Sequence, residues 1–134
     1  MRKNVFGRRL SRDTQGRTAL FKHLITALIK YGSIRTTQAK SKAIKGLVDK
    51  VVGAAKEGSL PKRRFLLSMF SKDTVKKLVN EVAPRFKTRT SGFTRITKIG
   101  TRLSDNASMA IMEWVERMEV KSEEVKDKKI AEKE

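Results

Sequence analysis

The sequence has no cysteine and only one histidine, one tryptophan and one tyrosine among its 134 residues. Without cysteine, disulfide bonds and thiolate metal sites are excluded. A single histidine forms an ordinary transition-metal site only if several carboxylates converge on it, and we therefore expect His23 at a partly exposed helix position. No metal and no cofactor is predicted.

The chain also lacks a long apolar run and a catalytic motif. Its longest apolar-rich stretch, ALFKHLITALIKY, is interrupted by Lys22, His23 and Lys30 and is too short to span a bilayer. The glycines form neither a phosphate-binding Walker loop nor a dinucleotide fingerprint. The scattered acidic residues show no recognised catalytic spacing, so the sequence does not support an enzyme.

Acidic residues are scarce: the chain has 14 of them against 32 lysines and arginines, for a formal charge of +18. Residues 1–117 hold 27 basic and 8 acidic side chains, whereas residues 118–134 hold 5 and 6. This excess repels itself in the folded state and favours an anionic partner. We predict one domain over residues 1–117 that engages this partner. Residues 118–134 have too few apolar side chains to pack, and we predict a mobile or weakly helical charged tail there.

A first helix is predicted after the basic N-terminus. Asp13 or Thr14 can cap it, apolar residues recur at helical spacing from Leu20 to Tyr31, and Gly32 supplies a stop signal. Residues 1–13, which contain few apolar anchors, are predicted to form an extended basic arm.

Three further helices follow in the sequence. The second begins after Thr37 and runs to about Glu57, with a continuous apolar face. Pro61 suits the first turn of a third helix. A fourth starts at Ser71 or Asp73, and Pro84 is expected to stop it.

Three β-rich segments complete the pattern: residues 33–37, 93–100 and 109–115. The last two are predicted to form a hairpin with a long connection. The expected fold is α/β in the broad sense (α+β), with a small three-stranded mixed sheet covered by about four helices in the order α-β-α-α-α-β-β.

The clearest functional signal is the stretch PRFKTRTSGFTRITKIG, which has five basic residues and no acidic one. Arg85, Lys87 and Arg89 occupy alternate positions, so in an extended chain they would project to one side and contact successive phosphates. Arg95, Lys98 and Arg102 continue the charge into the hairpin.

Other residues of this stretch have two readings each. Phe86 and Phe93 have aromatic rings that can stack on unpaired bases, but burial in the core is the favoured interpretation. Gly92 either makes a turn or allows close approach of the backbone to a phosphate.

Two more basic segments point to a polyanion. The first eighteen residues are rich in arginine, whose planar fork suits phosphate oxygens. The segment TTQAKSK places the amides of a helix N-terminus beside Lys40 and Lys42, an arrangement suited to an anion. An ordinary threonine cap with solvated lysines explains this second segment equally well.

The distribution of charge also bears on the class of partner. A membrane-surface helix needs an exposed apolar face, whereas these apolar faces are needed for the core. Positive charge on arm, helices, strands and loops favours folded RNA over a membrane. A DNA-binding architectural protein, which more often concentrates its charge on one arm or saddle, is the alternative.

From Met1 to about Val115, the sequence resembles the family of the seventeenth protein of the bacterial large ribosomal subunit. The matching segments are GRRLSR, IRTTQAKSKAIK, PRFKTRTSGFTRI and SDNASMAIMEWV, in the family's order. The resemblance implies an α/β fold without enzymatic activity. It further implies binding to large-subunit rRNA and neighbouring ribosomal proteins near the exit of the peptide tunnel, in the cytoplasm.

The resemblance also implies particular residues. The expected rRNA contacts are Arg2, Arg8, Arg9, Arg12, Arg17, Thr36, Thr37, Lys40, Lys42, Arg85, Arg89, Arg95 and Lys98, to which the charge pattern adds Lys3, Lys87 and Arg102. Asp105 and Asn106 match a loop motif and, with Gly92, are expected to shape the backbone. The chain departs from the family at Lys3, Gly16, Lys22–His23 and Ser91.

Overall fold

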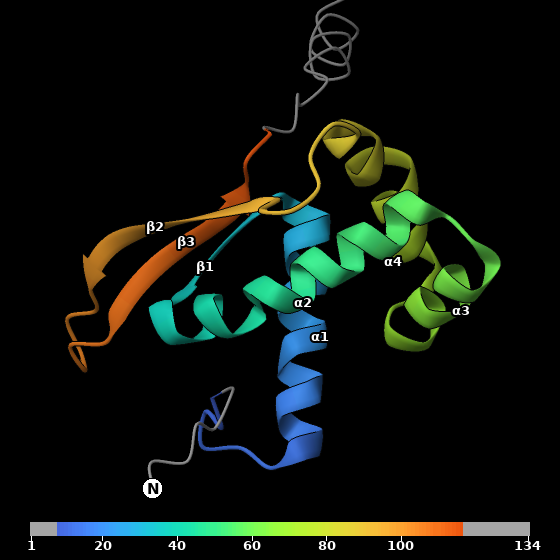
Figure 1. The fold of residues 1–134 in the computed structure, drawn as a ribbon. Helices are drawn as coiled ribbons and strands as arrows, with labels where there is room; N and C mark the ends of the chain where they lie inside the picture. The colour runs from blue at the N-terminus through green and yellow to red at the C-terminus, as the bar shows by residue number, and fades with distance from the viewer. Residues whose placement is uncertain (1–7, 117–134) are drawn as a thin grey trace, which may run out of the picture.

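The structure is a computed structural model that describes residues 8–116 (Figure 1). Its elements are α1 (Thr14–Tyr31), β1 (Ser33–Thr37), α2 (Gln38–Glu57), α3 (Leu60–Met69), α4 (Lys72–Lys77), the π-helical turn η1 (Leu78–Val82), the 3-10 helix η2 (Ala83–Phe86), β2 (Thr94–Thr101) and β3 (Ser108–Trp114). This confirms the α+β class and the predicted order of helices and strands. The tail at 118–134, Arg2 and Lys3 lie outside the described residues.

The three strands form one sheet in the order β1-β3-β2, and both pairings are antiparallel. The prediction of a mixed sheet is therefore wrong in this respect. The strands β1 and β2 run in the same direction, but the hairpin partner β3 lies between them, so no parallel pair forms.

The register assigns the side chains to two faces of the sheet. Arg35, Ile111 and Thr97 are directly opposite one another on the open face, whereas Thr36 and Ala110 are opposite each other on the face that the helices cover. The two sets separate because successive residues of a strand point to opposite sides. Figure 1 shows α1 and α2 on the covered side.

The core lies between this covered face and the helices. It is formed by apolar side chains at helical spacing in α1 and α2 and by alternate residues of β3. The main contributors are Ile25, Leu28, Ile29, Ile44, Val48, Val51, Val52, Met112 and Trp114. The apolar face of the second helix is thus confirmed, but Tyr31 at the end of the first is 76% exposed and lies outside the core.

Both ends of α1 follow from local sequence. The Asp13 carboxylate accepts a hydrogen bond from the Gly16 amide at 2.8 Å, which caps the first turn. A Cβ at Gly16 would lie 2.6 Å from that carboxylate oxygen, so the glycine fits the cap. Gly32 has a φ of 80° and ends the helix by donating to the Leu28 carbonyl.

The chain does not leave helical conformation at Pro84, contrary to the prediction. After α4 the helix widens into η1, where the Ala83 amide donates to the Leu78 carbonyl, and it then tightens into η2. Pro84 lies in the first turn of η2, where a residue needs no amide donor. Proline therefore begins a new turn here.

An aromatic cluster fixes the segment that leads from η2 to β2. The ring centroids of Phe86 and Phe93 are 5.2 Å apart, and those of Phe86 and Trp114 are 5.8 Å apart. The Trp114 indole donates to the Leu28 carbonyl at 3.3 Å, and the Phe93 amide donates to Asp49. Burial in the core is thus confirmed for both phenylalanines, and stacking on bases is excluded in this conformation.

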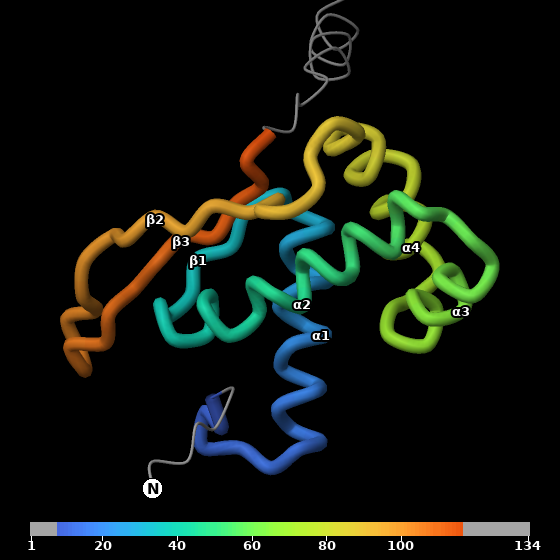
Figure 2. Tube along the Cα trace, viewed as in Figure 1, coloured from blue at the N-terminus to red at the C-terminus, as the bar shows by residue number. Residues whose placement is uncertain are grey.

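The β2–β3 hairpin and α3 lie on opposite sides of the molecule (Figure 2). The β2–β3 hairpin extends beyond the start of α2 at one end, and α3 lies at the other. Within residues 8–116, none of the helices combines the length and the apolar character needed to cross a membrane.

Candidate nucleic-acid interface

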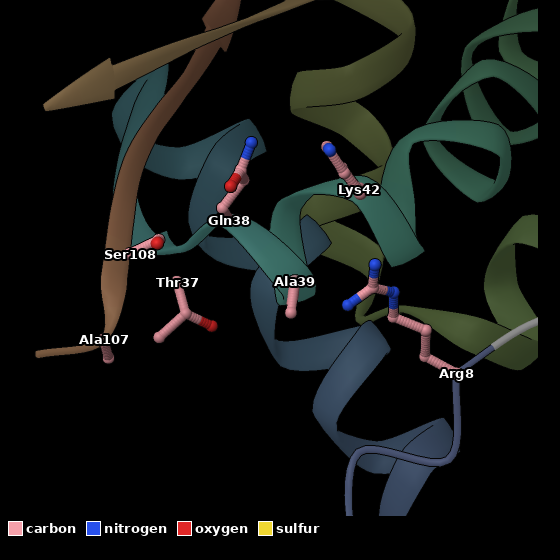
Figure 3. Close-up of a pocket in the computed structure, with 7 residues that line it drawn as sticks. All are labelled: Arg8, Thr37, Gln38, Ala39, Lys42, Ala107 and Ser108. Atoms are coloured by element: carbon pink, nitrogen blue, oxygen red, sulfur yellow. The ribbon is translucent and has the colours of Figure 1, made fainter. Parts of the chain in front are cut away.

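A pocket of about 380 Å³ lies where the arm, the start of α2 and the start of β3 meet (Figure 3). We call it the α2 pocket. Its lining residues are Arg8, Thr37, Gln38, Ala39, Lys42, Ala107 and Ser108. The Arg8 side chain extends from the arm toward the first turn of α2, so two cations from separate segments border one cavity.

The first turn of α2 leaves its amides available to this pocket. Thr37 is the N-cap residue with extended backbone, but its hydroxyl makes no capping hydrogen bond. The first amides of a helix have no partner within the helix, and they carry the positive end of the helix dipole. Together with Arg8 and Lys42, the first turn suits an anionic group such as a phosphate.

The neighbouring residues of the same segment differ in exposure. Thr36 is only 9% exposed because it faces the covered side of the sheet opposite Ala110. Lys40 is half-buried, whereas Lys42 is exposed. The side chains of Lys40 and Lys42 therefore reach the surface, and that of Thr36 does not.

The described part of the arm, residues 8–13, is not extended as predicted. The Arg12 amide donates to the Arg9 carbonyl at 3.2 Å, and Leu10 and Ser11 both have positive φ, at 54° and 52°. These angles form a tight turn of the mirror-image type. The turn leaves Arg8, Arg9 and Arg12 exposed, and Arg17 follows half-buried in α1.

The alternation predicted for Arg85, Lys87 and Arg89 does not exist. Arg85 lies half-buried in η2 and Lys87 lies in the turn that follows, so residues 85–88 form helix and turn, and Arg89 lies just beyond them. Three residues at alternate positions share one side only in a strand. The side chains of Arg85 and Lys87 do not project to one side because a new helical turn begins at Pro84.

Gly92 and one residue of the hairpin loop have positive φ, as expected for residues that shape the backbone. Gly92 has a φ of 70°, and Asn106 has a φ of 54°. Asp105 accepts a hydrogen bond from the Ala107 amide at 3.2 Å and a bidentate pair from Arg102 at 2.6 and 2.9 Å. The Arg102 guanidinium and the Ala107 amide lower the pKa of Asp105 to about 2.

Carboxylates from β3 and its flanks partly neutralise the basic segment. Arg95 pairs with Glu113 at 2.7 Å, and Arg89 lies 4.0 Å from Glu116. The sequence alone did not predict the Arg95–Glu113 pair. Glu113 is 18 positions beyond Arg95 and becomes its neighbour only through strand pairing. A guanidinium has five donors, so a pair of this kind leaves others for a phosphate.

The cations of β2 divide between the two faces of the sheet. Arg95 is opposite Glu113 on the open face, whereas Lys98 is opposite Ala110 on the covered side, and both are exposed. Sequence reasoning missed Arg35, which is exposed on the open face of β1. Successive side chains of a strand point to opposite faces, so the predicted strand SIRTT could have indicated that Arg35 lies on a different face from the buried Thr36.

Residues of the types that bind metal ions do not cluster in residues 8–116. No group of three histidine, cysteine or acidic side chains in this range could hold a metal ion. His23 is exposed on α1, as predicted.

Comparison with known proteins identifies the family. The family model for ribosomal protein L17 matches residues 20–115. The chain belongs to the ribosomal protein L17 family.

Curated relatives in several bacteria match this L17-family chain over nearly its whole length. The large ribosomal subunit protein bL17 of Thermodesulfovibrio yellowstonii is 44% identical over 132 residues, which cover 98% of this chain and 99% of that protein. The bL17 of Anaeromyxobacter dehalogenans is 40% identical and covers 96% of this chain and 80% of its own length. That of Rhodopseudomonas palustris is 44% identical, with coverage of 89% and 88%.

Proposed function

We propose that this protein is a structural, non-enzymatic component of the large ribosomal subunit in the bacterial cytoplasm. It binds large-subunit rRNA and neighbouring ribosomal proteins near the exit of the peptide tunnel. Its L17-family membership and its near full-length similarity to proteins named bL17 support the ribosomal role. The particular rRNA contacts are supported by the distribution of charge.

The observation that carries RNA binding is the spread of cations over several faces of one small domain. Arg8 and Lys42 border the α2 pocket, Arg35 and Arg95 lie on the open face of the sheet, and Lys98 lies on the other face. A partner that neutralises all of these must surround much of the molecule, as folded RNA does. Phosphate contacts of this kind position RNA segments and read little sequence.

The α2 pocket is the part of this surface best suited to one phosphate. In our proposal, the first-turn amides of α2 and the two cations hold a backbone phosphate, while arginines of the arm and of β2 contact neighbouring ones. Residues 1–117 form the rRNA-binding domain, and residues 118–134 are not required. A chain that ends at Arg117 should therefore still enter large subunits.

The direct test is sedimentation of a native cell lysate, in which an antibody follows the protein across the gradient. Co-migration with large subunits that survives a high-salt wash supports the proposal. Recovery with chromosomal DNA would instead favour an architectural DNA-binding protein. Recovery as free protein would contradict both.

A second test addresses the residues. Replacing Arg85, Arg89 and Arg95 together by glutamine should abolish incorporation while the circular dichroism of the free protein stays unchanged. The matched control replaces the exposed Lys45, Lys50 and Lys76 by glutamine, which removes the same charge elsewhere. Normal incorporation of the arginine variant would refute the assignment of that segment.

A further inference from the structure

The helix α3 exposes an unusual share of its apolar side chains. Leu60, Phe65 and Leu67 are 63%, 43% and 47% exposed, and Leu66 is the one buried residue of this ten-residue helix. Single exposed apolar residues are ordinary, but Leu60 and Leu67, seven positions apart, share one face of the helix, whereas Phe65 lies on another side. Apolar side chains that share one exposed face are typical of an interaction surface.

The exposed residues form an ordered stripe along the helix. Leu60, Arg63, Arg64 and Leu67 have the spacing i, i+3, i+4 and i+7, so they share one face of α3. All four are exposed. This stripe has an apolar residue at each end and two guanidinium groups in the middle.

The mixture of leucine and arginine distinguishes between possible occupants. A helix that lies on a membrane keeps its charges on the side opposite its apolar residues, whereas here Arg63 and Arg64 lie between the two leucines. RNA phosphates would engage the arginines but gain nothing from Leu60 and Leu67. A second copy of the chain is opposed by its charge of +18.

We propose that the stripe of α3 is a docking site for another protein of the large subunit. The partner presents an apolar surface for Leu60 and Leu67 and carboxylates for Arg63 and Arg64. Arginine is enriched at protein interfaces and among their energetically dominant residues, where its fork binds a carboxylate with two hydrogen bonds. This proposal rests on the ribosomal role proposed above.

The position of α3 suits a protein-docking surface that is separate from the residues proposed to contact rRNA. It lies at the end of the molecule away from the β2–β3 hairpin and the α2 pocket (Figure 1). Its acidic neighbour Glu57 pairs with Lys62 at 3.5 Å, on a different side of the helix from the stripe. The two arginines of the stripe make no ion pair with the described residues 8–116.

The absence of cysteine from the chain makes a single-site experiment possible. Ser68→Cys, at an exposed position beside the stripe and labelled with a maleimide benzophenone, is incorporated into large subunits, and the purified subunits are irradiated. Lys45→Cys on α2, labelled in the same way, is the control. We expect the Ser68→Cys probe to form an adduct with one ribosomal protein, attached near acidic and apolar residues, and the control probe not to form that adduct.

Charge reversal then tests the arginines. Adding Arg63→Glu and Arg64→Glu to the labelled chain should lower the yield of the protein adduct by about tenfold, with the melting temperature of the free protein unchanged. An adduct with rRNA alone, an adduct with a second copy, or no adduct would overturn the docking site.

The two proposals fail in different ways. A labelled chain that sediments with large subunits but gives no protein adduct refutes only the docking site. A wild-type chain that never sediments with large subunits refutes the ribosomal role, and the docking site falls with it.

Discussion

The guanidinium of Arg95 lies opposite the carboxylate of Glu113 on the open face of the sheet, where its Nε and Nη2 both donate to one carboxylate oxygen at 3.0 and 2.7 Å. This cross-strand pair joins β2 to β3 beside the residues proposed to contact rRNA. A side chain that is clamped in this way is already oriented when a phosphate arrives.

Arg95 has two proposed roles, the ion pair with Glu113 and a contact with rRNA. The charge swap Arg95→Glu with Glu113→Arg distinguishes these two roles. It keeps the pair and the net charge, so unfolding free energy should stay within about 0.5 kcal/mol, since an exposed pair contributes only about 0.2–1 kcal/mol. It also moves the guanidinium to β3, and affinity for a large-subunit rRNA fragment should fall about tenfold. A swapped protein that binds RNA as the wild type does would show that Arg95 only joins the strands.

The aromatic cluster predicts a large effect in the core. Phe93→Ala should reduce the unfolding free energy by about 3–5 kcal/mol, because the ring is 1% exposed and packs against Phe86. Trp114 is the only tryptophan and lies in this cluster, so its fluorescence reports denaturant unfolding. The control Phe65→Ala, at an exposed site, should cost less than about 1 kcal/mol. Equal losses would place Phe93 outside the core.

Two glycines should respond to alanine in opposite directions. Gly92→Ala should destabilise the protein by about 1–2 kcal/mol, because its φ of 70° disfavours any side chain although space is available. Gly46→Ala, inside α2 and equally free of close neighbours, should stabilise it by about 0.5–1 kcal/mol. Thermal unfolding of both variants measures the contrast, and a shift of the same sign in both would contradict this backbone argument.

The hairpin loop predicts a pH dependence at Asp105. Its pKa is about 2 in the folded chain, below the ordinary value of 3.8, with the Arg102 hydrogen bonds as the largest cause. The pair therefore stabilises the loop fully above pH 3.8, and this contribution is lost as the pH falls through about 2.

Removing the arginine tests this cause. Arg102→Gln should raise the pKa of Asp105 toward 3.8, as measured by NMR titration of its carboxyl carbon. Arg64→Gln, on α3, should leave it unchanged. An Asp105 pKa that stays near 2 in the Arg102 variant would assign the shift to the backbone instead.

Local sequence predicted most of the secondary structure because its signals act over a few residues. Asp13 accepts from Gly16 three positions later, and Gly32 takes the left-handed angle that ends α1. The same rule failed at Pro84, because a proline is compatible both with a helix stop and with the first turn of a new helix. In the structure, Phe86 at the end of this turn packs against Phe93 and Trp114, and this tertiary contact favours the second outcome.

By itself, the sequence determined the α+β class, the caps of α1, the buried apolar face of α2 and the large excess of positive charge. Composition and short-range periodicity are sufficient for these. Tertiary structure decided that β3 lies between β1 and β2, that Glu113 neutralises Arg95, and that the arm meets α2 and β3 at one pocket. Each of these joins residues far apart in the chain, and such contacts depend on how whole elements pack rather than on any local preference.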